Sequence, residues 1–242
     1  MPVATNVSGN LISQFWLPVV KEARKTVYPH RRKNARMKLL TLTDGIEPKE
    51  ILAFEKEQLI EKKDATAWVS GMQKKVRIEV EGIGNVIDGS VYDVNFLGDS
   101  CPLLEHFPFD ILNLDFSSQK NDDENERLEI EVQKLERFVQ LQKQAKCQKF
   151  VLMYTTFLDN QPVNVSNIID YSNSLTIGGW NGLVLNCNST VNDVANKKTV
   201  LKSIIEQVVN KYAYNIHGII KTTSSNSSGD NELFSLAAIM VV

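Results

Sequence analysis

The ten residues Phe109–Ser118 constrain the fold more than any other stretch of this chain. They read Phe-Asp-Ile-Leu-Asn-Leu-Asp-Phe-Ser-Ser, an apolar run that ends in polar and small residues. A continuous apolar run is typical of a strand that is buried on both faces in the middle of a parallel sheet. Polar residues at the carboxyl end of such a strand lie where open α/β sheets bind their ligands. The stretch therefore predicts an α/β fold and the position of its binding crevice.

Strands and helices alternate on both sides of this stretch. The pattern predicts strands at 38–43, 65–69, 84–87, 109–116, 149–156, 214–221 and 233–241, and helices at 48–59, 72–81, 121–146 and 193–211. This alternation indicates parallel βαβ crossovers. The last two strands are joined by a short polar link, so they must be antiparallel neighbours. We therefore expect an α/β, three-layer, doubly wound, mostly parallel seven-stranded sheet with a C-terminal antiparallel hairpin, plus an N-terminal helix.

The N-terminal region is predicted to be a helix followed by a basic connector. Leu11–Lys25 has the periodicity of an amphipathic helix, which Pro18 either kinks or divides by opening its second half. The run Arg31–Lys38 is rich in arginine and lysine and could contact a nucleic acid, a nucleotide phosphate or a protein partner. A solvated connector is the alternative, because no aromatic residues are interleaved to stack bases. We therefore divide the chain into 1–37 and a domain at 38–242.

The segment 157–191 is the one long region without a clear secondary-structure pattern. It is rich in Asn, Ser and Gly, with Trp180 among glycines and a short apolar run at 183–185. Structureless segments longer than about 15 residues are uncommon in compact domains, so a functional loop or lid is one interpretation. Trp180 would then be either a mobile stacking residue or an aromatic that fastens the loop to the core.

Composition and motifs exclude several classes of protein. The net charge is -2 and gives no general reason to expect nucleic acid or an acidic membrane as partner. Cys101, Cys147 and Cys187 are scattered, which argues against a zinc site and predicts reduced thiols in the cytoplasm. There is no apolar run long enough to span a membrane, no signal-peptide pattern at the start, no P-loop and no G-x-G-x-x-G.

The order of elements and the polar residues at neighbouring strand ends resemble the class I S-adenosylmethionine-dependent methyltransferases, which have a Rossmann-type fold. The resemblance covers about residues 38–242, with the N-terminal helix and connector as an addition. It implies the sheet order 3-2-1-4-5-7-6, in which the seventh strand is antiparallel. It also implies that S-adenosylmethionine lies across the carboxyl ends of the first strands.

The resemblance assigns cofactor-binding roles to three strand ends. Thr43, Asp44 and Gly45 follow the first strand, where Gly45 could supply a positive φ and Asp44 could accept a hydrogen bond from the cofactor's ammonium. The same Asp-Gly pair could equally be a plain helix-entry turn. The family usually has a ribose-binding carboxylate after the second strand, but Ser70 stands there instead. After the third strand, Asp88 with Gly89, or Asp93, is the candidate for the adenine amino group.

The end of the fourth strand is the candidate catalytic site. Asn113, Asp115 and Phe116 resemble the motif of amino-methylating enzymes, without its two prolines. In that interpretation the polar groups accept from the substrate amine and the aromatic ring supports the developing cation. Alternatively, Asp115 caps the next turn and Phe116 packs in the core. Tyr154 and Thr155, after the fifth strand's apolar run, could line the substrate pocket or satisfy local backbone groups.

Two functional hypotheses follow from these residues. The first is a divergent methyltransferase that uses S-adenosylmethionine and acts on an amine, for example one on a nucleobase. The second is a non-catalytic scaffold that serves as a binding or assembly module, as the missing glycines and the missing ribose carboxylate suggest. In the second case Arg31–Lys38 and the 157–191 loop would be its contact surfaces.

Overall fold

The structure of the protein, a computed structural model, describes most of the 242 residues. The described residues are 12–26, 36–43, 48–71, 75, 78–79, 81–89, 102–117, 123–159, 163–164, 190–191, 194–225 and 231–242. The predicted helix at 72–81 lies largely outside them, as do Asp93, Trp180 and the apolar run at 183–185.

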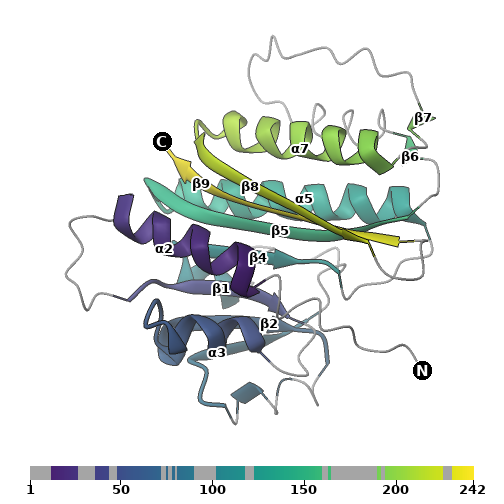
Figure 1. The fold of residues 1–242 in the computed structure, drawn as a ribbon. Helices are drawn as coiled ribbons and strands as arrows, with labels where there is room; N and C mark the ends of the chain where they lie inside the picture. Colours follow the sequence, from purple (N-terminus) through teal and green to yellow (C-terminus); the bar gives the residue numbers. More distant parts are fainter. Residues whose placement is uncertain are drawn as a thin grey trace.

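A seven-stranded sheet forms the centre of the fold (Figure 1). Its order is β3-β2-β1-β4-β5-β9-β8, and β9 is the strand that runs against its neighbours. With β8 and β9 as the sixth and seventh strands of the sheet, this is the order implied by the resemblance, so the fold prediction is confirmed. The strands are β1 (Leu39–Thr43), β2 (Ala65–Val69), β3 (Asn85–Asp88), β4 (Ile111–Asp115), β5 (Lys149–Asp159), β8 (Asn215–Ser225) and β9 (Asn231–Val241). Two short strands, β6 (Val163–Asn164) and β7 (Thr190–Val191), pair separately.

Helices cover both faces of the sheet, as predicted for a three-layer fold. One face is covered by η1 (Ile12–Trp16), α2 (Leu17–Thr26) and α3 (Lys49–Lys56), and the other by α5 (Glu124–Gln144) and α7 (Val194–Lys211). Two short 3-10 helices, η2 (Lys62–Asp64) and η3 (Pro102–His106), lie in connections. The N-terminal helix changes from π to α geometry at Leu17, so Pro18 lies in the first turn of α2, where proline is tolerated.

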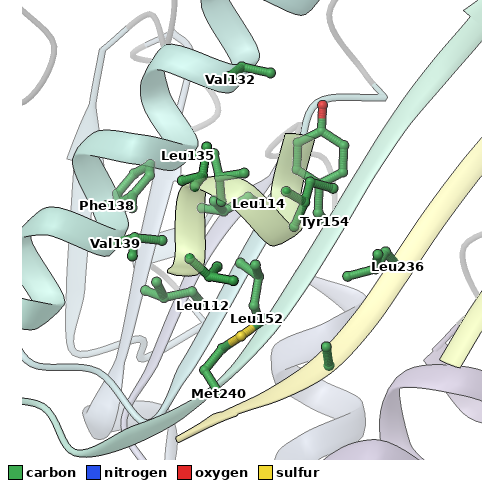
Figure 2. Packing of buried hydrophobic residues seen from close by; sticks show 14 of the residues in the cluster. Leu112, Leu114, Val132, Leu135, Phe138, Val139, Leu152, Tyr154, Leu236 and Met240 are labelled. Atoms are coloured by element: carbon green, nitrogen blue, oxygen red, sulfur yellow. The ribbon is translucent and has the colours of Figure 1, made fainter. Parts of the chain in front are cut away.

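A stripe of apolar side chains, spaced four, three and four residues apart along α5, packs against the sheet. Leu128, Val132, Leu135 and Val139 are all buried. Figure 2 shows the last three of them packed over the side chains of β4 and β5, Leu112, Leu114, Leu152 and Tyr154. Each such buried side chain contributes about 1.5–3 kcal/mol. The stripe therefore faces the core of a single domain.

The N-terminal helix contributes to the core on the opposite face. Trp16, Val19, Val20 and Ala23 are buried in the same cluster as residues of α3, β1, β5 and β9. The indole Nε1 of Trp16 also donates to Ser235 Oγ on β9, at 3.3 Å. The helix predicted to be an addition to the 38–242 domain is thus packed against the sheet of that domain.

Two strands are longer than predicted. β5 continues to Asp159 and β8 to Ser225, and both pair with β9 along their lengths. β4 ends at Asp115, which pairs with Thr155, so β5 extends four residues beyond the end of β4.

Candidate functional site

The strand pairing brings the predicted cofactor residues to one edge of the sheet. Thr43 pairs with Val69, and Val69 pairs with Asp88, so the carboxyl ends of β1, β2 and β3 are level. Ser70 and Gly89 follow directly and belong to the same edge. Asp44 and Gly45 lie outside the described residues.

The ends of β2 and β3 are tied together by hydrogen bonds. The backbone N–H of Gly71 donates to Asp88 Oδ1 at 2.7 Å, and Gly71 has a φ of 112°, which favours glycine. The indole Nε1 of Trp68 donates to the carbonyl of Gly89 at 2.7 Å. A Cβ at Gly89 would lie 3.0 Å from the Trp68 ring, so a larger residue would require the indole to shift by a few tenths of an ångström. Asp88 and Ser70 are exposed.

Asn113 lies behind the edge, on the α2–α3 face. Its amide Nδ2 donates to Thr41 Oγ1 at 2.9 Å, and Thr41 Oγ1 donates in turn to Glu50 Oε1 at 2.8 Å. The side chain is 1% exposed, and among the described residues its Oδ1 has no hydrogen-bond partner. Asn113 therefore belongs to a buried chain of hydrogen bonds that joins β4 to β1 and α3.

Asp115 and Phe116 occupy the end of β4. Asp115 is half-buried and accepts from the backbone N–H of Ser117 at 2.9 Å and from Ser117 Oγ at 2.5 Å. Phe116 is fully buried, and its ring packs against Tyr154 with centroids 5.6 Å apart. The structure thus shows the capping and packing contacts that the sequence offered as the alternative to a catalytic role. These contacts leave Asp115 at the end of β4, next to the edge formed by the carboxyl ends of β1, β2 and β3.

Tyr154 and Thr155 are buried and bind other side chains. Tyr154 points toward α5, where its hydroxyl donates to Glu131 Oε2 at 2.6 Å. Thr155 points to the opposite face, where its Oγ1 lies 3.0 Å from Ser235 Oγ. The sequence offered two interpretations of these residues, lining of a substrate pocket and bonding to local backbone groups. The contacts in the structure are instead hydrogen bonds to distant side chains.

A cluster of buried charged and polar side chains joins α5, β5 and α7. We call it the charged cluster, and it consists of Glu124, Arg127, Glu131, Tyr154, Thr156 and Lys197. Arg127 Nη1 donates to Glu131 Oε1 at 3.0 Å and to Thr156 Oγ1 at 2.6 Å, and its Nη2 donates to the carbonyl of Phe157 at 2.7 Å. Lys197 Nζ donates to Glu124 Oε2 at 2.6 Å.

Within this cluster the carboxyl group of Glu131 has an unusual pKa. Complete burial raises its pKa to about 7, although Arg127, Tyr154 and Thr156 each act to lower it. Reasoning from the sequence missed the cluster. The spacing of Glu124, Arg127 and Glu131 by three and four residues is a signal, because it places all three on one face of α5. A charged stripe of this kind is ordinarily interpreted as a solvated face.

Of the basic run Arg31–Lys38, the structure describes residues 36–38, and two of their side chains make contacts within the protein. Arg36 Nη1 donates to the carbonyl of Gln58 at 2.7 Å, and the ammonium of Lys38 donates to the carbonyl of His106. Arg31, Arg32 and Lys33 lie outside the described residues. In the described part of the chain, no helix has the length and apolar character to cross a membrane. The same residues contain no group of three or more His, Cys, Asp or Glu side chains suited to a metal ion.

Comparison with known proteins gives structural neighbours alone. No protein-family model matches the chain, and no curated protein matches it in sequence. Among solved structures, it is similar to M. jannaschii TYW2 in complex with AdoMet, at 12% identity and a TM-score of 0.46, covering 94% of this chain and 78% of that one.

Two further neighbours are a Synechocystis PCC 6803 enzyme and a Methanosarcina mazei protein. The first is magnesium protoporphyrin IX methyltransferase (ChlM) with bound SAH, at 7% identity and a TM-score of 0.41, covering 93% of this chain and 81% of that one. The second is a SAM-dependent methyltransferase, at 9% identity and a TM-score of 0.39, covering 89% and 96%. Because these TM-scores are below 0.5, the description of the chain as having a class I methyltransferase-like fold rests on its own strand order and pairing.

Proposed function

We propose that this protein binds S-adenosylmethionine across the carboxyl ends of β1, β2 and β3 and transfers its methyl group to an amine. The observation that carries the proposal is the strand pairing, which brings Thr43, Ser70 and Asp88 to one edge and leaves Asp115 beside it at the end of β4. Ligands of doubly wound sheets bind at this edge. Neighbours of similar fold were crystallised with AdoMet and with SAH.

The residues at this edge suit such a cofactor. A Cβ built on Gly71 would meet no atom of the described residues within 4 Å, so this part of the structure leaves open space beside the end of β2. Asp88 is exposed and presents a carboxylate at the same place. Thr43 and Gly89 complete the edge, and Asp44 and Gly45 are proposed to continue it in the turn after β1.

Asp115 is the group that we place next to the acceptor. Its carboxylate can accept the N–H of an amine and hold the nitrogen lone pair on the line of the sulfur–methyl bond. The new carbon–nitrogen bond forms as the sulfur–carbon bond breaks, and the proton of the amine leaves to water. Phe116, Asn113, Tyr154 and Thr155 are buried, so in this proposal they act by holding the ends of β4 and β5 in place around Asp115 and do not touch the acceptor.

Calorimetric titration of the purified protein with S-adenosylmethionine tests the cofactor part of this proposal. We expect saturable binding, and no measurable heat at millimolar cofactor would refute it. Asp115→Asn is then expected to leave cofactor binding unchanged and to lower methyl transfer to amine acceptors. Radiolabelled methyl transfer to a panel of amines and nucleobases measures this effect.

A non-catalytic scaffold is the second candidate. It is favoured by the internal bonding of the acceptor side, since Asn113, Asp115 and Tyr154 all make hydrogen bonds within the protein. Such a module would act through surfaces such as Arg31–Lys38 and the 157–191 loop. Tight cofactor binding that is abolished by Asp88→Ala would rule this candidate out.

A further inference from the structure

The end of β2 lacks a carboxylate of its own. Val69 is fully buried, and Ser70 offers a single hydroxyl. A ribose presents two neighbouring hydroxyl groups, each of which donates one hydrogen bond. A carboxylate has two oxygens and accepts from both, whereas a serine hydroxyl has a single oxygen atom.

Asp88 reaches this place from the neighbouring strand. It ends β3, pairs with Val69, and its Oδ1 accepts the N–H of Gly71, two residues beyond the end of β2. The carboxylate is therefore held over the β2 terminus, although it comes from β3.

The side chain of Asp88 keeps acceptor capacity for a ligand. The hydrogen bond from Gly71 uses Oδ1, and among the described residues Oδ2 has no protein partner. The side chain is exposed, and the space at the Cβ position of Gly71 is open. A carboxylate that is anchored by one oxygen and open at the other loses little side-chain entropy when a ligand binds.

The turn that carries Asp88 is itself braced. The N–H of Gly89 donates to the carbonyl of Val69 at 2.9 Å, and the Trp68 indole donates to the carbonyl of Gly89. Gly89, the residue that follows Asp88, is thus bonded to β2 through both its N–H and its carbonyl. This bracing holds the backbone beside Asp88, and the bond from Gly71 holds the carboxylate itself.

We propose that Asp88, delivered from β3 and anchored on Gly71, binds the ribose hydroxyls of a nucleoside at the end of β2. This assignment rests on the proposed function for the placement of a nucleoside at this edge. It differs from the role of Asp88 in contacting the adenine amino group. It also removes the objection that the missing carboxylate on β2 raises against cofactor binding.

NMR titration of the protein with adenosine and with 2′-deoxyadenosine tests the assignment, alongside calorimetric titration with S-adenosylmethionine. We expect the wild-type protein to prefer adenosine by about tenfold, because a charge-assisted hydrogen bond contributes about 1.5–3 kcal/mol. Asp88→Asn keeps an oxygen for the Gly71 N–H and loses the charge. We expect it to weaken adenosine binding about tenfold or more and to abolish the preference over 2′-deoxyadenosine.

Glu81→Gln is the matched control, since it removes one exposed carboxylate shortly before the other end of β3. It should leave both affinities unchanged. Equal affinities of the wild-type protein for the two nucleosides, or a preference that survives in Asp88→Asn, would overturn the assignment.

The titration with S-adenosylmethionine separates this inference from the proposed function. If the cofactor binds but Asp88 gives no ribose preference, the proposed function stands and the inference fails. If adenosine shows the Asp88-dependent preference but S-adenosylmethionine does not bind, the inference stands and the proposed function fails. Absence of binding by all three ligands overturns both.

Discussion

Two buried polar clusters lie on opposite faces of the sheet, near the carboxyl ends of β4 and β5, and they are built differently. The charged cluster on the α5–α7 face joins two cations and two carboxylates. On the α2–α3 face lie two separate hydrogen-bonded groups rich in hydroxyls, which together we call the hydroxyl cluster. One is Trp16, Ser235 and Thr155, and the other is Asn113, Thr41 and Glu50.

The two clusters should differ in how much stability is lost when one of their side chains is removed. Removal of one member of a buried ion pair leaves a charge without compensation, at a cost of about 3–5 kcal/mol. Loss of a neutral hydrogen bond costs about 1 kcal/mol. In the hydroxyl cluster Asn113 Oδ1 lacks a partner in the described part of the chain, whereas each oxygen of Glu131 in the charged cluster accepts at least one hydrogen bond. We therefore expect the α5 face to be intolerant of substitution and the α2–α3 face to be tolerant.

The largest expected effect is that of Arg127→Met. It removes the cation that bonds Glu131, Thr156 and the Phe157 carbonyl, and we expect a loss of about 3–5 kcal/mol in the free energy of unfolding. Denaturant unfolding followed by circular dichroism measures it. Arg137→Met, on the partly exposed side of the same helix, should cost less than about 1 kcal/mol. Equal effects of the two substitutions would break the comparison.

The pH dependence of stability should identify Glu131. Its pKa rises from 4.5 to about 7 in the folded state, so the folded protein holds this proton where the unfolded chain has lost it. The stabilisation is complete below pH 4.5 and is lost as the pH rises through about 7. At about 1.4 kcal/mol per pKa unit, the expected decline is about 3 kcal/mol.

Glu131→Gln should remove this decline, because the carboxamide does not titrate. Unfolding free energies measured at several pH values between 4 and 8 give the slope. Glu126→Gln, an exposed position on the same helix, serves as the control and should retain the wild-type slope. A Glu131→Gln variant with an unchanged slope would show that another group titrates.

A matched pair of substitutions on β5 compares the two clusters directly. Tyr154→Phe keeps the ring against Phe116 and removes the hydrogen bond to the Glu131 carboxylate, for an expected loss of about 1.5–3 kcal/mol. Thr155→Val removes the bond to Ser235, which is a neutral hydrogen bond, so about 1 kcal/mol is expected. The reverse order of the two losses, measured by thermal or denaturant unfolding, would contradict the comparison.

The smallest effect is expected for Asn113→Leu. The substitution removes a buried oxygen that has no partner among the described residues and one neutral hydrogen bond to Thr41, which keeps its bond to Glu50. The change in unfolding free energy should lie within about 1 kcal/mol of the wild-type value. A loss above about 2 kcal/mol would show that Asn113 contributes as much to the free energy of unfolding as residues of the charged cluster do, and would contradict the comparison.

The positions of the strands along the chain were predictable because apolar runs and their spacing report on them directly, whereas their order in the sheet was implied by the family resemblance. Each predicted strand in the first five matches the structure to within a few residues, and the closing hairpin follows from its short link. The ends of β5 and β8 were not predictable, since Asp159, Ser224 and Ser225 are residues typical of loops and become strand only by pairing with β9.

The partners of the candidate site residues could not be predicted from local sequence. Tyr154 bonds Glu131 because helix packing brings together residues 23 positions apart, and Asn113 bonds Thr41 across 72 positions. The position of the strand ends was predictable, because parallel strands share one carboxyl edge. Side chains alternate between the two faces of the sheet along each strand, and Asn113 and Tyr154 point to opposite faces. Which helices cover each face could not be read from the strands themselves.

The unequal lengths of β4 and β5 give this edge of the sheet a step. β5 continues for four residues beyond the level at which β4 stops, a height of about 13 Å at about 3.3 Å per residue. β9 follows it to Asn231, and β8 follows β9 to Ser225, so the step is three strands wide. An acceptor at Asp115 would lie at the foot of this wall and approach from the side of β1. If the proposed methyl transfer takes place there, the height of this wall, set by the last four residues of β5 and the first of β9, would limit the size of the acceptor on that side.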